Sequence, residues 1–176
     1  MLEMMLSAKI PQGINVEISG KKIVASYQNK KIEKEFKVKN ISLEKQGDKI
    51  VIKTLNDKRK TIACANTLLA HIRNIFKGLL EGFEYRLAIV HSHFPMNVSK
   101  KGNLIEIKNF LGEKNPRYVK ILGDVDVQIK GKEIVVKGYN IWDVSQTAAN
   151  LENATRVSAR DRRIFQDGIY ITHKGK

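Results

Sequence analysis

Short stretches in which hydrophobic and polar residues alternate dominate the beginning of the chain. The apolar members of the first two stretches are Ile14, Val16, Ile18, Ile23, Ala25 and Tyr27. Alternation places successive side chains on opposite faces of an extended backbone, so each stretch predicts a β-strand with one buried face. A further strand is predicted around Ile50 and Ile52, after the turn sequence QGD.

The hydrophobic period changes after residue 64. From there the apolar residues recur at steps of three and four, and they are Ala65, Leu68, Leu69, Ile72, Ile75, Phe76, Leu79, Leu80 and Phe83. This spacing predicts an amphipathic helix with Gly82 near its end. Strands followed by a helix indicate an antiparallel sheet with the helix packed on one face.

The same order of patterns occurs again 84 residues further along the chain. The matching anchors are Pro11 and Pro95, residues 50–53 and 134–137, and residues 65–66 and 149–150. Between the first two anchors the match slips by two residues, since GKKIVAS from Gly20 aligns best with GNLIEIK from Gly102. A fixed period with drift in the loops predicts a duplication. We therefore expect an α+β fold of two tandem repeated small domains, each an antiparallel sheet with one helix packed on one face.

This duplication sets the expected domain boundaries. Residues 1–10 form an N-terminal extension with no assigned role, residues 11–89 the first repeat and residues 90–176 the second repeat. The helix of the second repeat is expected to start at Asp143, which stands in capping-box spacing with Gln146, and to run through VSQTAANLENAT.

The two repeats differ most in the segment that follows the start of the helix. Residues 67–84 carry the apolar stripe, whereas the corresponding segment after Leu151 contains Arg156, Arg160, Arg162 and Arg163. A guanidinium is a planar, permanently charged fork of donors that binds phosphate and stacks on bases. The segment is therefore predicted to bind phosphate groups. The alternative is a solvated loop that Asp161 and Asp167 partly neutralise.

The charge balance favours the first of these readings. The chain has 32 Lys and Arg against 18 Asp and Glu, a net charge of +14, which is typical of proteins with a polyanionic partner. A membrane partner is not favoured, because no apolar run approaches the roughly 20 residues of a spanning helix. The single cysteine, Cys64, cannot form an internal disulfide and fits a reducing, cytoplasmic compartment.

Five motifs make the chain recognisable. They are IPQGINVEISGKKIV at 10–24, AIVHSHFPMNV at 88–98, FLGEKNPR at 110–117, VSQTAANLENAT at 144–155 and RDRRIFQDGIYI at 160–171. Together they resemble ribosomal protein six of the large subunit, in its archaeal and eukaryotic form. The resemblance implies a non-enzymatic protein with two tandem α+β domains that binds large-subunit ribosomal RNA near the factor-binding side, close to the sarcin-ricin loop. It also implies that the second domain is the main RNA binder and that the neighbours are other ribosomal proteins.

The expected contact surface follows from where basic residues cluster. In decreasing order of weight, its members are Arg156, Arg160, Arg162 and Arg163, then Lys114 and Arg117, then Lys100, Lys101, Lys174 and Lys176. The lysines of the first repeat are dispersed along strands, which is more typical of a solvated face than of a focused site. Few aromatic residues lie outside apolar patterns, so recognition of folded RNA by shape and phosphate contacts is favoured over stacking on single strands.

Other chemistries have weaker support in the sequence. His91 and His93 could share one strand face as half of a metal site, but no further ligand accompanies them, so a junction segment in which the pair packs or hydrogen-bonds is favoured. Cys64 and Ser92 show no triad signature, and Cys64 between alanines is expected to be buried. No phosphate-binding glycine loop is present. We expect no enzyme activity, no cofactor, no metal and no small-molecule substrate. The alternative function is a freestanding nucleic-acid binding or RNA-chaperoning module.

Overall fold

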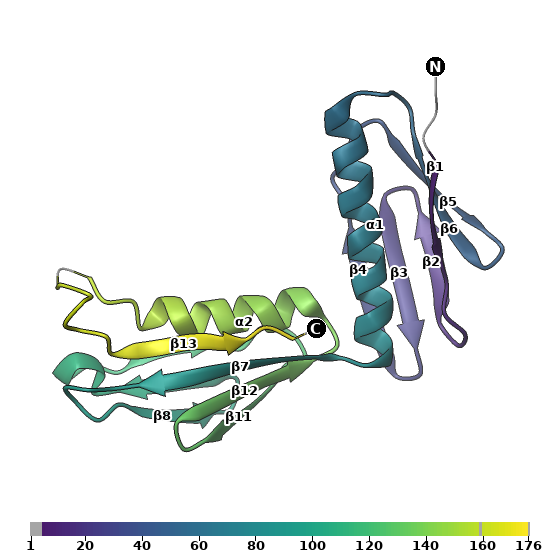
Figure 1. The fold of residues 1–176 in the computed structure, drawn as a ribbon. Helices are drawn as coiled ribbons and strands as arrows, with labels where there is room; N and C mark the ends of the chain where they lie inside the picture. The colour runs from purple at the N-terminus through teal and green to yellow at the C-terminus, as the bar shows by residue number, and fades with distance from the viewer. Residues whose placement is uncertain (1–4, 159, 176) are drawn as a thin grey trace. The chain divides into compact units, whose positions relative to one another are not determined.

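The computed structural model describes residues 5–158 and 160–175 (Figure 1). The chain divides into two compact units, of which the first ends at Glu81 and the second begins at Gly82. We refer to them as unit one and unit two and describe each by itself.

The described residues of unit one form two three-stranded antiparallel sheets and one helix. Its elements are β1 (Met5–Lys9), β2 (Asn15–Ser19), β3 (Lys22–Tyr27), β4 (Lys30–Glu35), β5 (Ile41–Gln46), β6 (Lys49–Thr54) and α1 (Arg59–Leu80). One sheet has the strand order β1-β6-β5 and the other β2-β3-β4. Helix α1 contacts strands of both sheets.

Unit two repeats this arrangement and adds a strand. Its elements are β7 (Phe83–Val90), β8 (Asn97–Lys101), β9 (Leu104–Lys108), a 3-10 turn (Phe110–Gly112), β10 (Arg117–Lys120), β11 (Asp126–Lys130), β12 (Glu133–Gly138), α2 (Ile141–Ala154) and β13 (Gly168–His173). The sheet orders are β10-β9-β8 and β11-β12-β7-β13, with all pairs antiparallel. Strand β13 lies along the edge of β7 and has no counterpart among the described residues of unit one.

The repeat is visible in positions as well as in topology. Strands β2 and β8 begin and end 82 residues apart, and β6 and β12 begin and end 84 residues apart. The hairpin that follows β2 turns at Gly20 and the hairpin that follows β8 turns at Gly102, both with positive φ, which glycine adopts without steric cost. The slip of two residues predicted from the sequence thus lies in the connection between these hairpins and the later strands.

The buried faces of the two helices match at an offset of 83. Thr61, Ala65 and Leu68 of α1 are buried, and so are Val144, Ala148 and Leu151 of α2, each 83 residues further on. The sequence anchor that paired residues 65–66 with 149–150 is therefore wrong by one residue. Burial decides the register, because the apolar side chains of both helices must face the sheets.

Most of the fold follows the sequence prediction, and the α+β class is confirmed. The apolar stripe of α1 is buried through Leu79, and Leu87, Ile105, Ile107, Phe110 and Ile121 are among the fully buried side chains of unit two. One expectation was too simple. Each unit has two sheets rather than one, because the β2-β3-β4 and β8-β9-β10 strands pair only among themselves and meet the rest of the unit through side chains.

Three boundaries also differ from expectation. The second unit starts at Gly82 instead of residue 90, because β7 pairs with β12 and β13; Phe83 accordingly lies in this strand and not in the helix. The expected extension at residues 1–10 is not separate, since β1 pairs with β6, while residues 1–4 lie outside the described part. Helix α2 starts before Asp143: Asn140 is the N-cap, accepts from the Trp142 amide and donates to Asp143 in the first turn.

Candidate nucleic-acid interface

A loop between α2 and β13, residues 155–167, carries the four arginines, and we call it the arginine loop. It begins at Thr155, whose buried hydroxyl accepts a 2.8 Å hydrogen bond from the amide of Ile169 and lies 3.3 Å from the carbonyl oxygens of Leu151 and Glu152. The hydroxyl therefore ties the last turn of α2 to β13. This contact fixes where the chain leaves the helix.

The middle of the loop is a turn organised by Asp161. Its carboxylate accepts a 2.9 Å hydrogen bond from the Arg163 amide, and its carbonyl oxygen accepts bonds from the amides of Ile164 and Phe165. Short polar side chains that bind the backbone two residues on are typical of tight turns. Asp161 thus shapes the backbone and does not pair with a guanidinium, contrary to the neutralised-loop alternative.

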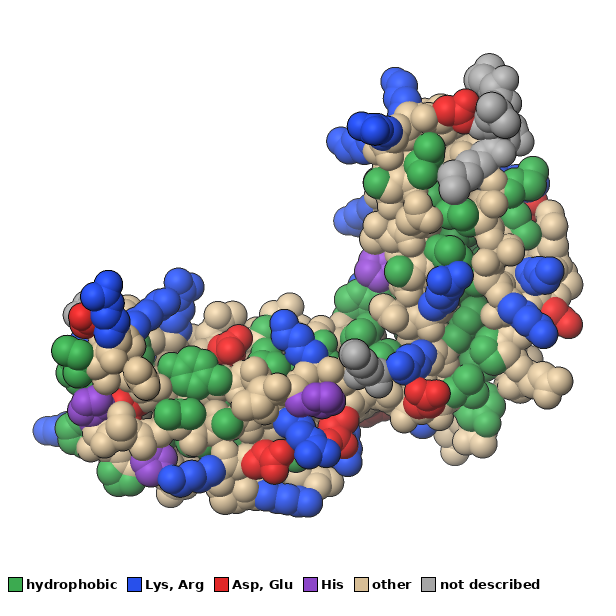
Figure 2. Space-filling view, in the orientation of Figure 1, with side chains coloured by type: hydrophobic (Ala, Val, Ile, Leu, Met, Phe, Trp, Pro, Cys, Tyr) green, Lys and Arg blue, Asp and Glu red, His purple; other side chains and the backbone are tan. Residues whose placement is uncertain are grey.

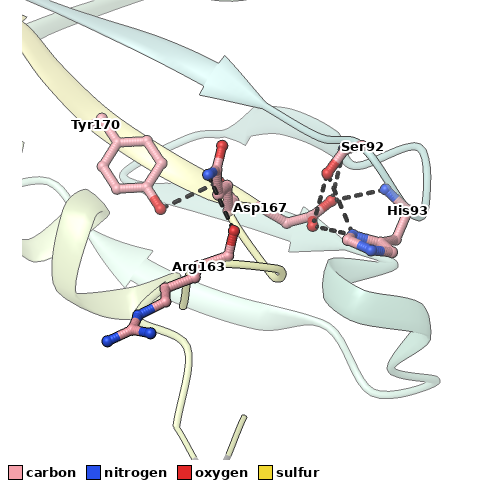
Figure 3. A network of polar contacts seen from close by, with 6 residues as sticks. Ser92, His93, Arg163, Asp167 and Tyr170 are labelled. Atoms are coloured by element: carbon pink, nitrogen blue, oxygen red, sulfur yellow. Dashed lines mark hydrogen bonds and ion pairs between the residues drawn. The ribbon is translucent and has the colours of Figure 1, made fainter. Parts of the chain in front are cut away.

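The loop ends at a buried carboxylate. Asp167 is only 2% exposed and accepts hydrogen bonds from the Ser92 amide at 2.8 Å, the His93 amide at 3.1 Å and the His93 Nδ1 at 2.7 Å (Figure 3). Burial alone raises the pKa of this carboxyl, but the bonds from His93 and Ser92 outweigh burial and hold the pKa well below its usual value. The ionised Asp167 anchors the loop to the β7–β8 connection.

The arginine side chains of this anchored loop reach solvent, although the Arg162 guanidinium also donates a 3.5 Å hydrogen bond to the Val157 carbonyl oxygen. All four arginines are exposed, and in the described residues none of their side chains has a carboxylate oxygen within 4.0 Å. Figure 3 shows the Arg163 side chain directed away from Asp167. Arg160 lies over the Phe165 ring at 4.8 Å, and the His93 ring stacks on Phe165 at 4.7 Å. Lys and Arg side chains gather at this end of unit two in Figure 2.

The second pair of predicted contact residues lies around the start of β10, with Lys114 in the preceding turn and Arg117 as the first residue of the strand, and the two differ. Lys114 is exposed. Arg117 instead binds within the fold: its guanidinium donates 2.6 Å to the carbonyl oxygen of Ala154, pairs with Glu113 and covers the Phe110 ring at 4.4 Å. Arg117 therefore caps the C-terminal end of α2, where the arginine loop begins. Its guanidinium is engaged within the fold and has little freedom to bind phosphate.

The last predicted contact residues, Lys100, Lys101 and Lys174, lie at the end of unit two opposite the arginine loop. Strand β13 starts at the arginine loop and ends at His173, so Lys174 is one strand length away from the arginines. Lys100 and Lys101 lie at the β8–β9 turn and pair with Asp126 at 3.2 Å and with the nearly buried Glu106 at 2.8 Å. The sequence therefore grouped residues that the fold separates. Lys176 lies outside the described residues.

Sequence reasoning missed the residues that hold the loop in place. Packing or hydrogen bonding was expected for the pair His91 and His93, but the partner could not be named, because Asp167 lies more than 70 positions away in the sequence. Across the described residues no group of three or more His, Cys, Asp or Glu is arranged to hold a metal ion. Cys64 is exposed and not buried as expected, because it lies just beside the buried stripe of α1.

These features define a basic, tandem α+β protein whose second unit presents an anchored arginine loop. The ribosomal protein L6 family model matches residues 94–168, the segment from the β7–β8 connection to the start of β13. Large ribosomal subunit protein uL6 of Methanococcus vannielii is 44% identical over 94% of this chain and 91% of its own length. The protein of the same name from Staphylothermus marinus is 45% identical over 95% of this chain and 92% of its own length. The chain belongs to the uL6 family of ribosomal proteins.

No described helix is both long enough and apolar enough to cross a bilayer.

Proposed function

We propose that the chain is a structural, non-enzymatic constituent of the large ribosomal subunit in the cytoplasm and binds ribosomal RNA mainly through the arginine loop of unit two. The observation that carries this proposal is the loop itself: four exposed guanidiniums stand on a backbone anchored at both ends by Thr155 and Asp167. An anchored loop loses less conformational entropy on binding than a free one. Exposed arginines without carboxylate partners are then available for phosphate oxygens.

Family membership supports the ribosomal part of the proposal, since the relatives are named as large-subunit proteins. The motif resemblance further supports a location near the factor-binding side of the subunit, with other ribosomal proteins as neighbours. Within unit two, the proposed RNA surface extends to Lys114 in the turn before β10. Lys100, Lys101 and Lys174 lie at the opposite end of the unit from the arginine loop and would form a separate contact.

Sedimentation of a cell lysate that contains the tagged chain tests the proposal. The chain is expected to travel with the large subunit at low and moderate salt. Recovery of the chain entirely in the soluble fraction, together with equal affinity for unrelated RNA, would contradict it in favour of a freestanding nucleic-acid binder.

A further inference from the structure

Two pairs of lysines from separate segments of unit one meet at one surface groove. Lys37 and Lys39 belong to the connection between β4 and β5, and Lys58 and Lys60 flank the start of α1. All four line the same groove, and we call them the lysine rim. From the sequence the lysines of this unit looked dispersed, because about twenty positions separate the two pairs.

The lysine rim carries charge of one sign. Its four side chains are exposed, and none of them forms an ion pair within the described part of the chain. Arg59 adds a further positive charge, the first turn of α1 has no acidic residue, and Asp57 is the acidic neighbour in sequence. Figure 2 shows Lys and Arg side chains gathered over this end of α1. By contrast, Lys22 and Lys53 of unit one pair with Glu33 and Glu44.

The groove between the lysines is small: more of its exposed lining is apolar than polar, but the total apolar area is slight. Asn40, Thr61 and Cys64 line it together with Val38, which is half-buried. A groove of this kind offers little apolar area to a protein partner, whose binding energy comes largely from a buried apolar centre. Flexible ammonium groups around so small a groove instead suit a polyanionic backbone, whose phosphates can be contacted without strict geometry.

We propose that the lysine rim is a second contact of this chain with the phosphate backbone of ribosomal RNA. This inference rests on the proposed function, because RNA bound by unit two is held by the same chain that carries the lysine rim. A contact that is weak by itself becomes populated when a linked site already holds the same partner at high effective concentration. The rim then acts as an auxiliary electrostatic contact, sensitive to salt, while the arginine loop remains the principal one.

Cys64 makes the proposal testable without labelling the protein elsewhere. It is the chain's single cysteine, it is exposed, and it lines the groove. The measurement is the rate of alkylation of Cys64 by iodoacetamide, a neutral reagent, in the free protein and in the presence of deproteinised large-subunit ribosomal RNA. RNA is expected to slow the reaction several-fold at low salt, and added salt is expected to remove the protection.

Two variants of equal charge separate the rim from general electrostatics. The rim variant changes Lys37, Lys39, Lys58 and Lys60 to Gln, and the matched control changes the exposed residues Lys21, Lys30, Lys31 and Lys49 to Gln. Because nearby charge also affects thiol reactivity, the ratio of bound to free rates is compared within each variant. The rim variant should lose the protection while still binding RNA, and the control variant should keep it.

The other outcomes each decide a different question. RNA binding with no protection of Cys64 overturns the inference and leaves the proposed function intact. Protection in assembled large subunits but not with RNA alone also overturns it, because a neighbouring protein then covers the groove. Absence of any RNA binding contradicts the proposed function, and the inference with it.

Discussion

The second half of α1 and the arginine loop occupy corresponding stretches of two repeated units, yet one is core and the other is surface. The buried faces of the two helices stay in register through Ile72 and Thr155, which are 0% and 2% exposed. Beyond this point α1 continues for two more turns and buries Ile75, Phe76 and Leu79. Unit two instead leaves the helix and exposes four arginines before it returns as β13.

The difference shows how one copy of a repeated fold can place exposed binding residues where the other copy has core residues. In unit two the edge of β7 is covered by β13, and α2 contacts this strand as well as β12. The added strand supplies apolar packing through Ile169, which is 1% exposed, so unit two keeps a closed core with a shorter helix. The exposed arginines between α2 and β13 then take no part in packing the core, although Val157 and Phe165 of the same loop do. The comparison therefore predicts that substitutions in the second half of α1 lower stability, whereas substitutions of the arginines in the loop weaken RNA binding.

The largest expected effect is on stability in unit one. Replacing Phe76 by Ala removes a nearly fully buried ring, and substitutions of this kind lower the free energy of unfolding by about 3–5 kcal/mol. Denaturant unfolding followed by far-UV circular dichroism should show an earlier transition. The single tryptophan, Trp142, lies in unit two, so its fluorescence should report an almost unchanged transition there. A fluorescence transition that shifts equally would show that the stripe of α1 also supports unit two.

The second expected effect is on RNA binding in unit two. Changing Arg156, Arg160, Arg162 and Arg163 to Gln should leave the melting temperature nearly unchanged, because exposed charges contribute little to stability. The affinity for large-subunit RNA should fall, and the slope of log affinity against log salt should become shallower by up to roughly 0.7–0.9 for each lost phosphate contact.

The control for this variant removes four charges from unit one at Lys21, Lys30, Lys31 and Lys49. Equal loss of affinity in both variants would mean that only total charge matters and that the arginine loop is not a focused site. Early melting of the arginine variant would mean that the loop is structural.

The sequence predicted the repetition, both helices and strands such as β2, β3 and β6, because hydrophobic period and turn glycines are local properties. It did not predict β1, β4, β5 and β7. It could not show that Lys100 and Lys101 pair with Asp126 and Glu106, or that Arg117 caps α2, because such contacts depend on which strand ends meet in space. For the same reason Lys37 and Lys58 looked unrelated until the fold brought them to one groove. Charge in a sequence therefore indicates a kind of partner, and the fold decides which charges remain available to it.

A smaller effect is expected at the anchor of the arginine loop. Asp167→Asn removes the buried charge that four donor groups of Ser92 and His93 surround, and weakening such bonds lowers the stability of unit two by about 1–3 kcal/mol. The folded-state pKa of Asp167 is lowered, so its ionic stabilisation is complete above the unfolded pKa of about 3.9 and is lost as the pH falls below that value.

Trp142 fluorescence during urea unfolding at several pH values measures this effect. The difference between the wild-type chain and Asp167→Asn should be constant above about pH 5 and should shrink as the pH falls below about 4. Affinity for RNA should also drop in the variant at neutral pH, because the loop loses its attachment to the β7–β8 connection. A stability difference that grows toward low pH is incompatible with an ionised Asp167 as the anchor.

The smallest expected effect separates the geometry of one arginine from its charge. Arg160 lies over Phe165, whose ring also stacks on His93, so the guanidinium rests on a ring held in place by the Asp167 anchor. Arg160→Lys keeps the charge but loses the planar stacking surface, which at exposed sites contributes about 0.5–1 kcal/mol. The affinity for RNA should therefore fall only about two- to five-fold, while the salt slope stays unchanged because the number of charges is the same. Phe165→Leu should have a similar effect on affinity, since it removes the ring and leaves every arginine in place. If Arg160→Lys instead flattens the salt slope, or if Phe165→Leu leaves the affinity unchanged, then Arg160 acts as one charge among four and the ring beneath it has no part in positioning the guanidinium.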